Sequence, residues 1–139
     1  EAAQTQGLGV VGSVYPGSDA ATLAAQVAQA SAFLYLVSSY GRSGGGFEAE
    51  ALTDPLARLR AAGAGPVGVG FGLRTPDDHR AVFRAGADMS ITGSAFTGII
   101  ARHADDPAAL RTAWATALAP IAAAREDWRA TPHRSPEHA

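Results

Sequence analysis

Two strand-like runs of the sequence end in glycine, a pattern that suits the binding of an anion such as phosphate. The run VGVGFGL contains Gly72, and the run SITGSA contains Gly93 followed by Ser94. Glycine lets a ligand approach the backbone closely, and the free N–H groups at the start of a following helix attract negative charge. Ser94 adds a hydroxyl donor. Together the two strand ends form a candidate phosphate site.

The same glycines have an alternative interpretation that rests on packing alone. Gly68 and Gly70 can make room for bulky neighbours across a crowded interior, while Gly72 and Gly93 can be ordinary turn residues. The residue pattern alone leaves phosphate binding and packing open as two alternatives of similar weight.

Few titratable side chains accompany these glycines. Tyr35 lies inside the apolar run FLYLVS, where core packing is the simpler interpretation of a tyrosine. His79 and His103 fall among charged residues of predicted amphipathic helices, so we expect both on the surface. Asp77 and Asp78 fall in a predicted first helical turn, where acids compensate the helix dipole. The residues therefore indicate a chain that holds a phosphate but has no acid–base pair of its own.

Composition excludes several classes of function. The 139 residues carry a formal net charge of -2 and form no basic stripe, which argues against a nucleic-acid partner. Without cysteine, disulfides and thiolate metal sites are ruled out, and the histidines match no metal-ligand spacing, so we expect no metal. No apolar run approaches the roughly 20 residues of a membrane span. We expect a soluble, cytoplasmic protein that makes no membrane contact.

Short apolar runs alternate with helical stretches, in the order β-α-β-α-β-α-β-α. The expected strands are 8–14, 33–38, 66–72 and 88–93, and the expected helices are 22–32, 54–64, 75–87, 96–104 and 107–124. Ser18 or Asp19 is the predicted N-cap of the first helix, and Thr75 caps the third with Pro76 at its first position. Helices between strands require parallel pairing, and continuous apolar strands indicate a sheet covered on both faces.

Four β/α units are half of the eight that a (β/α)8 TIM barrel builds from about 250 residues. The predicted fold class is therefore α/β, either half of such a barrel or a small open sheet. We place a half-barrel domain at residues 1–124 and expect a flexible C-terminal tail at residues 125–139. Pro120 is expected to kink or break the last helix. In either architecture, ligands bind at the carboxyl ends of the strands.

Three segments resemble the C-terminal half of the tryptophan synthase alpha chain family. They are AFLYLVSSYGRSGGG, PVGVGFGLRTPDDHRAVFRAGAD and SITGSAFTGII. The family pattern is Y-x-x-S with a glycine-containing loop, then P-x-x-x-GFGI-x-x-P, then GAD and I-x-GSA. The order and spacing match from Leu8 to Arg125, nearly the whole chain. The resemblance implies four consecutive β/α units that form the C-terminal half of a (β/α)8 TIM barrel.

The resemblance also implies an activity and a set of site residues. Members of the family cleave indole-3-glycerol phosphate by a retro-aldol reaction into indole and glyceraldehyde 3-phosphate. They pass the indole to a beta chain that uses pyridoxal phosphate, whereas no cofactor is expected in this chain. Matched by position, the phosphate-binding residues are Gly44, Gly72, Gly93 and Ser94, the residues lining the substrate pocket are Phe71 and Ile91, and Tyr35 is a supporting catalytic residue near the acid.

The sequence departs from the family where catalysis is concerned. The family's two catalytic carboxylates come from its N-terminal half, so we expect this chain alone to be inactive. Ser39 stands where the family has a loop arginine. Three interpretations stay open: one half of a barrel, a divergent relative that cleaves another indolyl phosphate, or a non-catalytic phosphate-binding or partner-activating module. An open parallel edge favours a homo-oligomer or a complementary half-barrel as partner.

Overall fold

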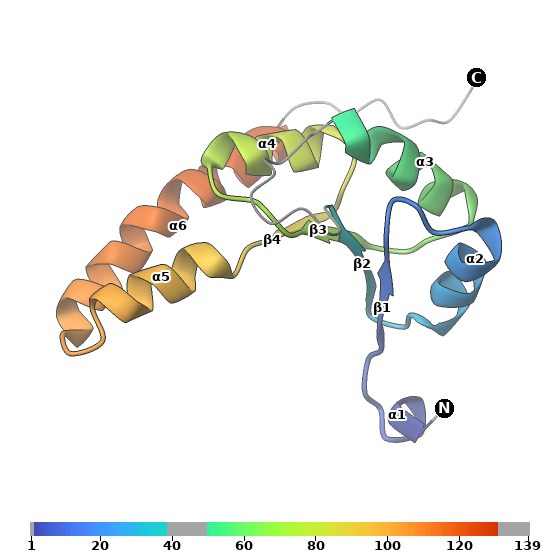
Figure 1. Ribbon diagram of the computed structural model, residues 1–139, viewed down its shortest axis with the longest axis horizontal. Helices are drawn as coiled ribbons and strands as arrows, with labels where there is room; N and C mark the ends of the chain where they lie inside the picture. The colour runs from blue at the N-terminus through green and yellow to red at the C-terminus, as the bar shows by residue number, and fades with distance from the viewer. Residues whose placement is uncertain (1, 39–49, 131–139) are drawn as a thin grey trace.

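One parallel sheet organises the protein, and its strands follow the chain order β1-β2-β3-β4 (Figure 1). The computed structural model describes residues 2–38 and 50–130. The strands are β1 (Val11–Val14), β2 (Phe33–Val37), β3 (Val67–Gly70) and β4 (Met89–Ile91), each shorter than expected. All neighbouring pairs are parallel. The alternation of strands and helices confirms the predicted α/β class.

Helices connect these strands and follow the last one. They are α1 (Ala2–Thr5), α2 (Ala20–Gln29), the 3-10 helix η1 (Glu50–Leu52), α3 (Thr53–Ala61), α4 (Pro76–Arg84), α5 (Ser94–Arg102) and α6 (Pro107–Ala130). Asp19 caps α2, because its carboxylate accepts a hydrogen bond from the Thr22 amide at 2.7 Å. Thr75 and Asp78 form a capping box at the start of α4. Both helix starts confirm predicted caps, whereas α1 has no counterpart among the predicted elements.

The main core lies between the sheet and the helices along one side of it (Figure 1). Its members from the strands are Val14, Leu34, Leu36, Val67 and Val69, and its members from the helices include Leu23, Leu56, Leu59 and Val82. Alternate side chains of each strand point to the opposite face of the sheet, away from this core. Val11 on that face is 45% exposed. The second face of the sheet is therefore open at β1, contrary to the predicted cover on both faces, whereas β3 is buried along its whole length.

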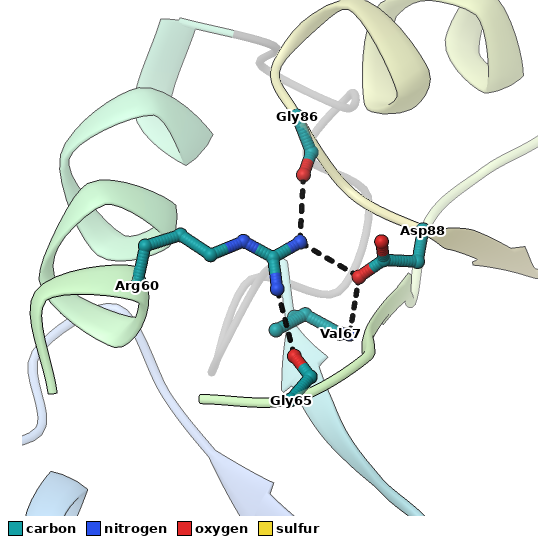
Figure 2. A network of polar contacts seen from close by, with 5 residues as sticks. All are labelled: Arg60, Gly65, Val67, Gly86 and Asp88. Carbon is teal, nitrogen blue, oxygen red and sulfur yellow. Dashed lines mark hydrogen bonds and ion pairs between the residues drawn. The ribbon is translucent and has the colours of Figure 1, made fainter. Parts of the chain in front are cut away.

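A polar network centred on Arg60 joins the amino ends of β3 and β4 (Figure 2). The guanidinium donates to the carbonyl oxygens of Gly65 and Gly86, at 2.7 and 3.0 Å, and to the Asp88 carboxylate at 2.7 Å. The same carboxylate oxygen accepts the Val67 amide at 2.7 Å. The network fixes the turn before each of the two strands, at the opposite end of the sheet from the strand carboxyl ends.

The last helix runs beyond the boundary drawn from the sequence. We expected a flexible tail from Arg125, but α6 continues through Pro120 and on to Ala130. Trp128 stacks on Phe83 of α4, with ring centroids 5.6 Å apart. This aromatic contact joins the end of α6 to α4. Residues 131–139 lie outside the described part of the chain. None of the helices within residues 2–38 and 50–130 combines the length and the apolar composition that a membrane span requires.

Candidate functional site

A pocket of about 360 Å³ opens at the carboxyl ends of β2, β3 and β4. Its walls are Tyr35, Phe71, Gly72, Leu73, Ile91, Thr92, Gly93 and Ser94. The structure thus brings together every site residue predicted from the sequence except Gly44, which lies outside the described residues. Residues from three strand ends meet here because parallel strands present their carboxyl ends at the same edge of a sheet.

The junction of β4 and α5 contributes an uncapped helix start to this pocket. Gly93 is the N-cap residue of α5 and provides no side-chain hydrogen bond to the first turn. The first amides of a helix have no intrahelical acceptor. The Phe96 and Thr97 amides donate to the Gly93 carbonyl, so among the described residues the amides of Ser94 and Ala95 are the ones available to a ligand. A Cβ built on Gly93 would meet no atom within 4 Å, and Ser94 is exposed beside it. The arrangement offers amide donors, a hydroxyl and space for an anion.

The turn after β3 forms the facing wall in an unusual backbone conformation. Phe71 has φ +83° and Gly72 has φ +81°, both in the left-handed region. Such a φ is natural for glycine and costly for a phenylalanine. The Phe71 side chain is 62% exposed at the pocket. Backbone strain of this kind clusters at ligand sites, where the surrounding structure maintains it.

The Tyr35 side chain occupies the space that a side chain at Gly70, on the neighbouring strand β3, would need. A Cβ on Gly70 would lie 2.6 Å from the Tyr35 hydroxyl and 2.7 Å from its ring. A Cβ on Gly68 would lie 2.9 Å from Ile91 Cδ1. These two glycines therefore serve packing, which is the alternative raised for them from the sequence. Burial raises the pKa of Tyr35, so its hydroxyl stays protonated near neutral pH.

No carboxylate or imidazole that could act as a general acid or base lines the pocket in the described part of the chain. Within residues 2–38 and 50–130, the pocket wall contains no aspartate, glutamate, histidine or arginine. The same ranges contain no cluster of three or more residues suited to a metal ion. The pocket wall therefore offers hydrogen-bond donors and apolar surface, which can hold an anionic ligand but supply no general base.

His79 corrects one prediction from the sequence. We expected it on the surface, but only 1% of it is exposed, and its Nδ1 lies 2.9 Å from Ser90 Oγ on β4. The charged residues beside it in the sequence are on other faces of α4, so its local environment in the chain is misleading. Burial lowers the pKa of His79, although the nearby Asp78 carboxylate acts in the opposite direction. His79 is a packing residue behind β4 and does not line the pocket.

The fold and the site define the class of protein. It is half of a (β/α)8 barrel, with a pocket of hydrogen-bond donors and apolar side chains at the carboxyl ends of its strands. A family model described as tryptophan synthase alpha chain matches residues 1–125. This chain belongs to the tryptophan synthase alpha chain family.

Curated relatives agree with this assignment. The tryptophan synthase alpha chain of Novosphingobium aromaticivorans is 38% identical over 103 residues, which cover 73% of this chain and 38% of that protein. The alpha chain of Gloeobacter violaceus is 39% identical over 106 residues, which cover 76% of this chain and 38% of that protein. The chain therefore spans about two fifths of the length of these relatives.

Solved structures support the half-barrel fold. Mycobacterium tuberculosis tryptophan synthase superimposes with a TM-score of 0.71 at 28% identity, covering 88% of this chain and 44% of that chain. A chain of the tryptophan synthase a2b2 complex of Pyrococcus furiosus gives a TM-score of 0.73 at 24% identity, with 87% and 48% covered. Both comparisons match nearly all of this chain to less than half of a longer one, which confirms the predicted half-barrel class.

Proposed function

We propose that this chain is the phosphate-binding half of a lyase that cleaves indole-3-glycerol phosphate into indole and glyceraldehyde 3-phosphate. The observation that carries the proposal is the uncapped start of α5 at Gly93, which opens onto a pocket with Gly72 on its facing wall. The family assignment supports a phosphate ester as the ligand. The pocket is lined on its apolar side by Phe71 and Ile91, which suit an aromatic ring.

The chemical steps of this proposal are divided between two halves of a barrel. Retro-aldol cleavage needs a group that protonates the indole ring and a group that removes a hydroxyl proton. We propose that both groups are carboxylates and that they come from the N-terminal β/α units of the longer relatives. The half-barrel described here holds the phosphate and the ring. A beta chain is a further proposed partner, because a relative from Pyrococcus furiosus forms an a2b2 complex.

Binding of glycerol 3-phosphate to the purified chain tests the site. We expect Gly93→Asp to weaken binding by at least about tenfold, because a carboxylate would stand where the anion binds. The measurement is an NMR titration that follows the amide signals of Gly72 and Ser94. Gly65→Asp is the matched control, since Gly65 is also an exposed glycine with open space at its Cβ, but at the amino end of β3. Equal affinity of wild type and Gly93→Asp would refute the site.

A second candidate is a non-catalytic phosphate-binding module that associates with another copy of itself. The observation in its favour is the exposed apolar surface at the sheet edge, where Val11 is 45% and Leu8 is 62% exposed. Both candidates predict phosphate binding and no indole release by this chain alone. They differ in whether addition of an N-terminal half-barrel from a relative restores cleavage of indole-3-glycerol phosphate, which only the first requires.

A further inference from the structure

The turn that contains Gly72 is held from both neighbouring strands by hydroxyl groups. Ser38, directly after β2, directs its Oγ at the carbonyl oxygens of Gly70 and Phe71, at 2.8 and 2.5 Å. Thr92, directly after β4, donates from Oγ1 to the carbonyl oxygen of Leu73 at 3.3 Å. These three contacts join residues that are 19 to 33 positions apart in the chain.

The contact of the Ser38 hydroxyl with the Phe71 carbonyl also sets the direction of the Gly72 N–H. A peptide group is planar and trans, so the carbonyl oxygen of Phe71 and the N–H of Gly72 point in opposite directions. With the oxygen directed toward Ser38, the Gly72 N–H points away from Ser38. In the part of the chain that the structure describes, this N–H has no hydrogen-bond acceptor. Gly72 itself lines the pocket.

The other side of the turn is fixed in the same way. The peptide group between Leu73 and Arg74 is bound at its oxygen by Thr92 and at its N–H by the Asp78 carboxylate, at 2.8 Å. Asp78 belongs to the capping box of α4, so the turn is tied to a rigid helix start. Without such ties, a phenylalanine at φ +83° has a strong tendency to leave the left-handed region.

We propose that Ser38 and Thr92 are positioning residues for the phosphate site, because their hydroxyls hold the two ends of the Phe71–Leu73 turn in the conformation that presents the Gly72 amide to the ligand. This inference rests on the proposed phosphate site. Neither residue needs to touch the ligand for this role. Ser38 acts through the Phe71 carbonyl, and Thr92 acts through the Leu73 carbonyl.

The experiment measures two properties of Ser38→Ala in the purified full chain. The first is the NMR signal of the Gly72 amide without ligand, which we expect to shift and broaden as the peptide group samples other orientations. The second is the affinity for inorganic phosphate, which we expect to fall about tenfold. Ser38→Thr keeps the hydroxyl and is expected to restore both. Ser13→Ala, at an exposed serine on β1, is the control for loss of a strand serine.

The two readouts separate this inference from the proposed function. If wild type binds no phosphate but the Gly72 signal of Ser38→Ala changes, the phosphate site is refuted, whereas the part of the inference that Ser38 orients the Gly72 amide is supported. If Ser38→Ala leaves both the Gly72 signal and the affinity unchanged, the positioning role is refuted. Should Ser38→Ala fail to fold, Thr92→Val tests the second contact with the same readouts, because valine keeps the shape of threonine and removes its hydroxyl. Thr92→Ser is then the variant that restores them.

Discussion

His79 is a titratable side chain enclosed between α4 and β4, with Ser90 as its hydrogen-bond partner. Burial lowers the pKa of His79 below its usual 6.5, against the opposing effect of Asp78. Between the lowered pKa and 6.5, the unfolded chain therefore binds more protons than the folded chain. Stability from the neutral imidazole is fully present above about pH 6.5 and is lost as the pH falls through that range.

The lowered pKa of His79 gives a prediction for acid unfolding. We expect the free energy of unfolding of wild type to decrease as the pH falls below about 6.5, and we expect His79→Gln to flatten that dependence. Urea unfolding followed by circular dichroism at pH 5 to 8 measures both. His103→Gln, which leaves the buried ring in place, is the control and should keep the wild-type slope. If the free energy of unfolding depended on pH with the same slope in wild type and His79→Gln, the contribution of His79 to acid unfolding would be refuted.

At the scale of elements, the Arg60 network couples two strand starts to the helix before β3 (Figure 2). Asp88→Ala removes the acceptor of the buried Val67 amide and one partner of Arg60. We expect a loss of about 1–3 kcal/mol in the free energy of unfolding, since a buried amide left without an acceptor costs that much. Urea denaturation measures the loss, and phosphate affinity should change little because the network is at the other end of the sheet.

A second ion pair in the molecule is a matched control for this prediction. Arg80 and Asp77 are also 2.7 Å apart, but they are three positions apart on α4 and the Asp77 side chain is 88% exposed. Exposed pairs of this kind contribute little, so Arg80→Ala should cost less than about 1 kcal/mol. An Asp88→Ala variant that is no less stable than Arg80→Ala would show that the network does not hold the strand starts.

The elements differ in how far the sequence could predict them. The start of α4 follows from Thr75, Pro76 and Asp78 within four positions of one another, and the structure confirms it because a capping box is a local interaction. The burial of His79 depends on β4 and could not be inferred from its charged neighbours. The contact of Ser38 with Phe71 spans 33 positions and exists only once two strands pair. Local chemistry is predictable, whereas contacts made by sheet pairing need the structure.

At the scale of the molecule, this half-barrel leaves exposed a surface that a closed barrel would enclose. Apolar side chains with large exposed fractions occur at the sheet and on the last helices: Val11 at 45%, Phe71 at 62%, Ile100 at 41% and Leu118 at 46%. Among the strands that the structure describes, β1 and β4 are the two edges of the sheet, each with one neighbour. Unpaired strand edges and exposed apolar patches favour association.

We therefore expect the purified chain to sediment as a dimer or a larger species at micromolar concentration. Val11→Lys should shift it toward monomer, because a charge on an edge strand opposes pairing with a second sheet. Thr116→Lys is the control, since it places the same charge on an exposed position of α6 away from the sheet. Analytical ultracentrifugation measures the mass of each variant, with thermal melts to show that both are folded. A wild-type chain that sediments as a monomer would refute self-association and leave the complementary half-barrel as the partner that closes the sheet.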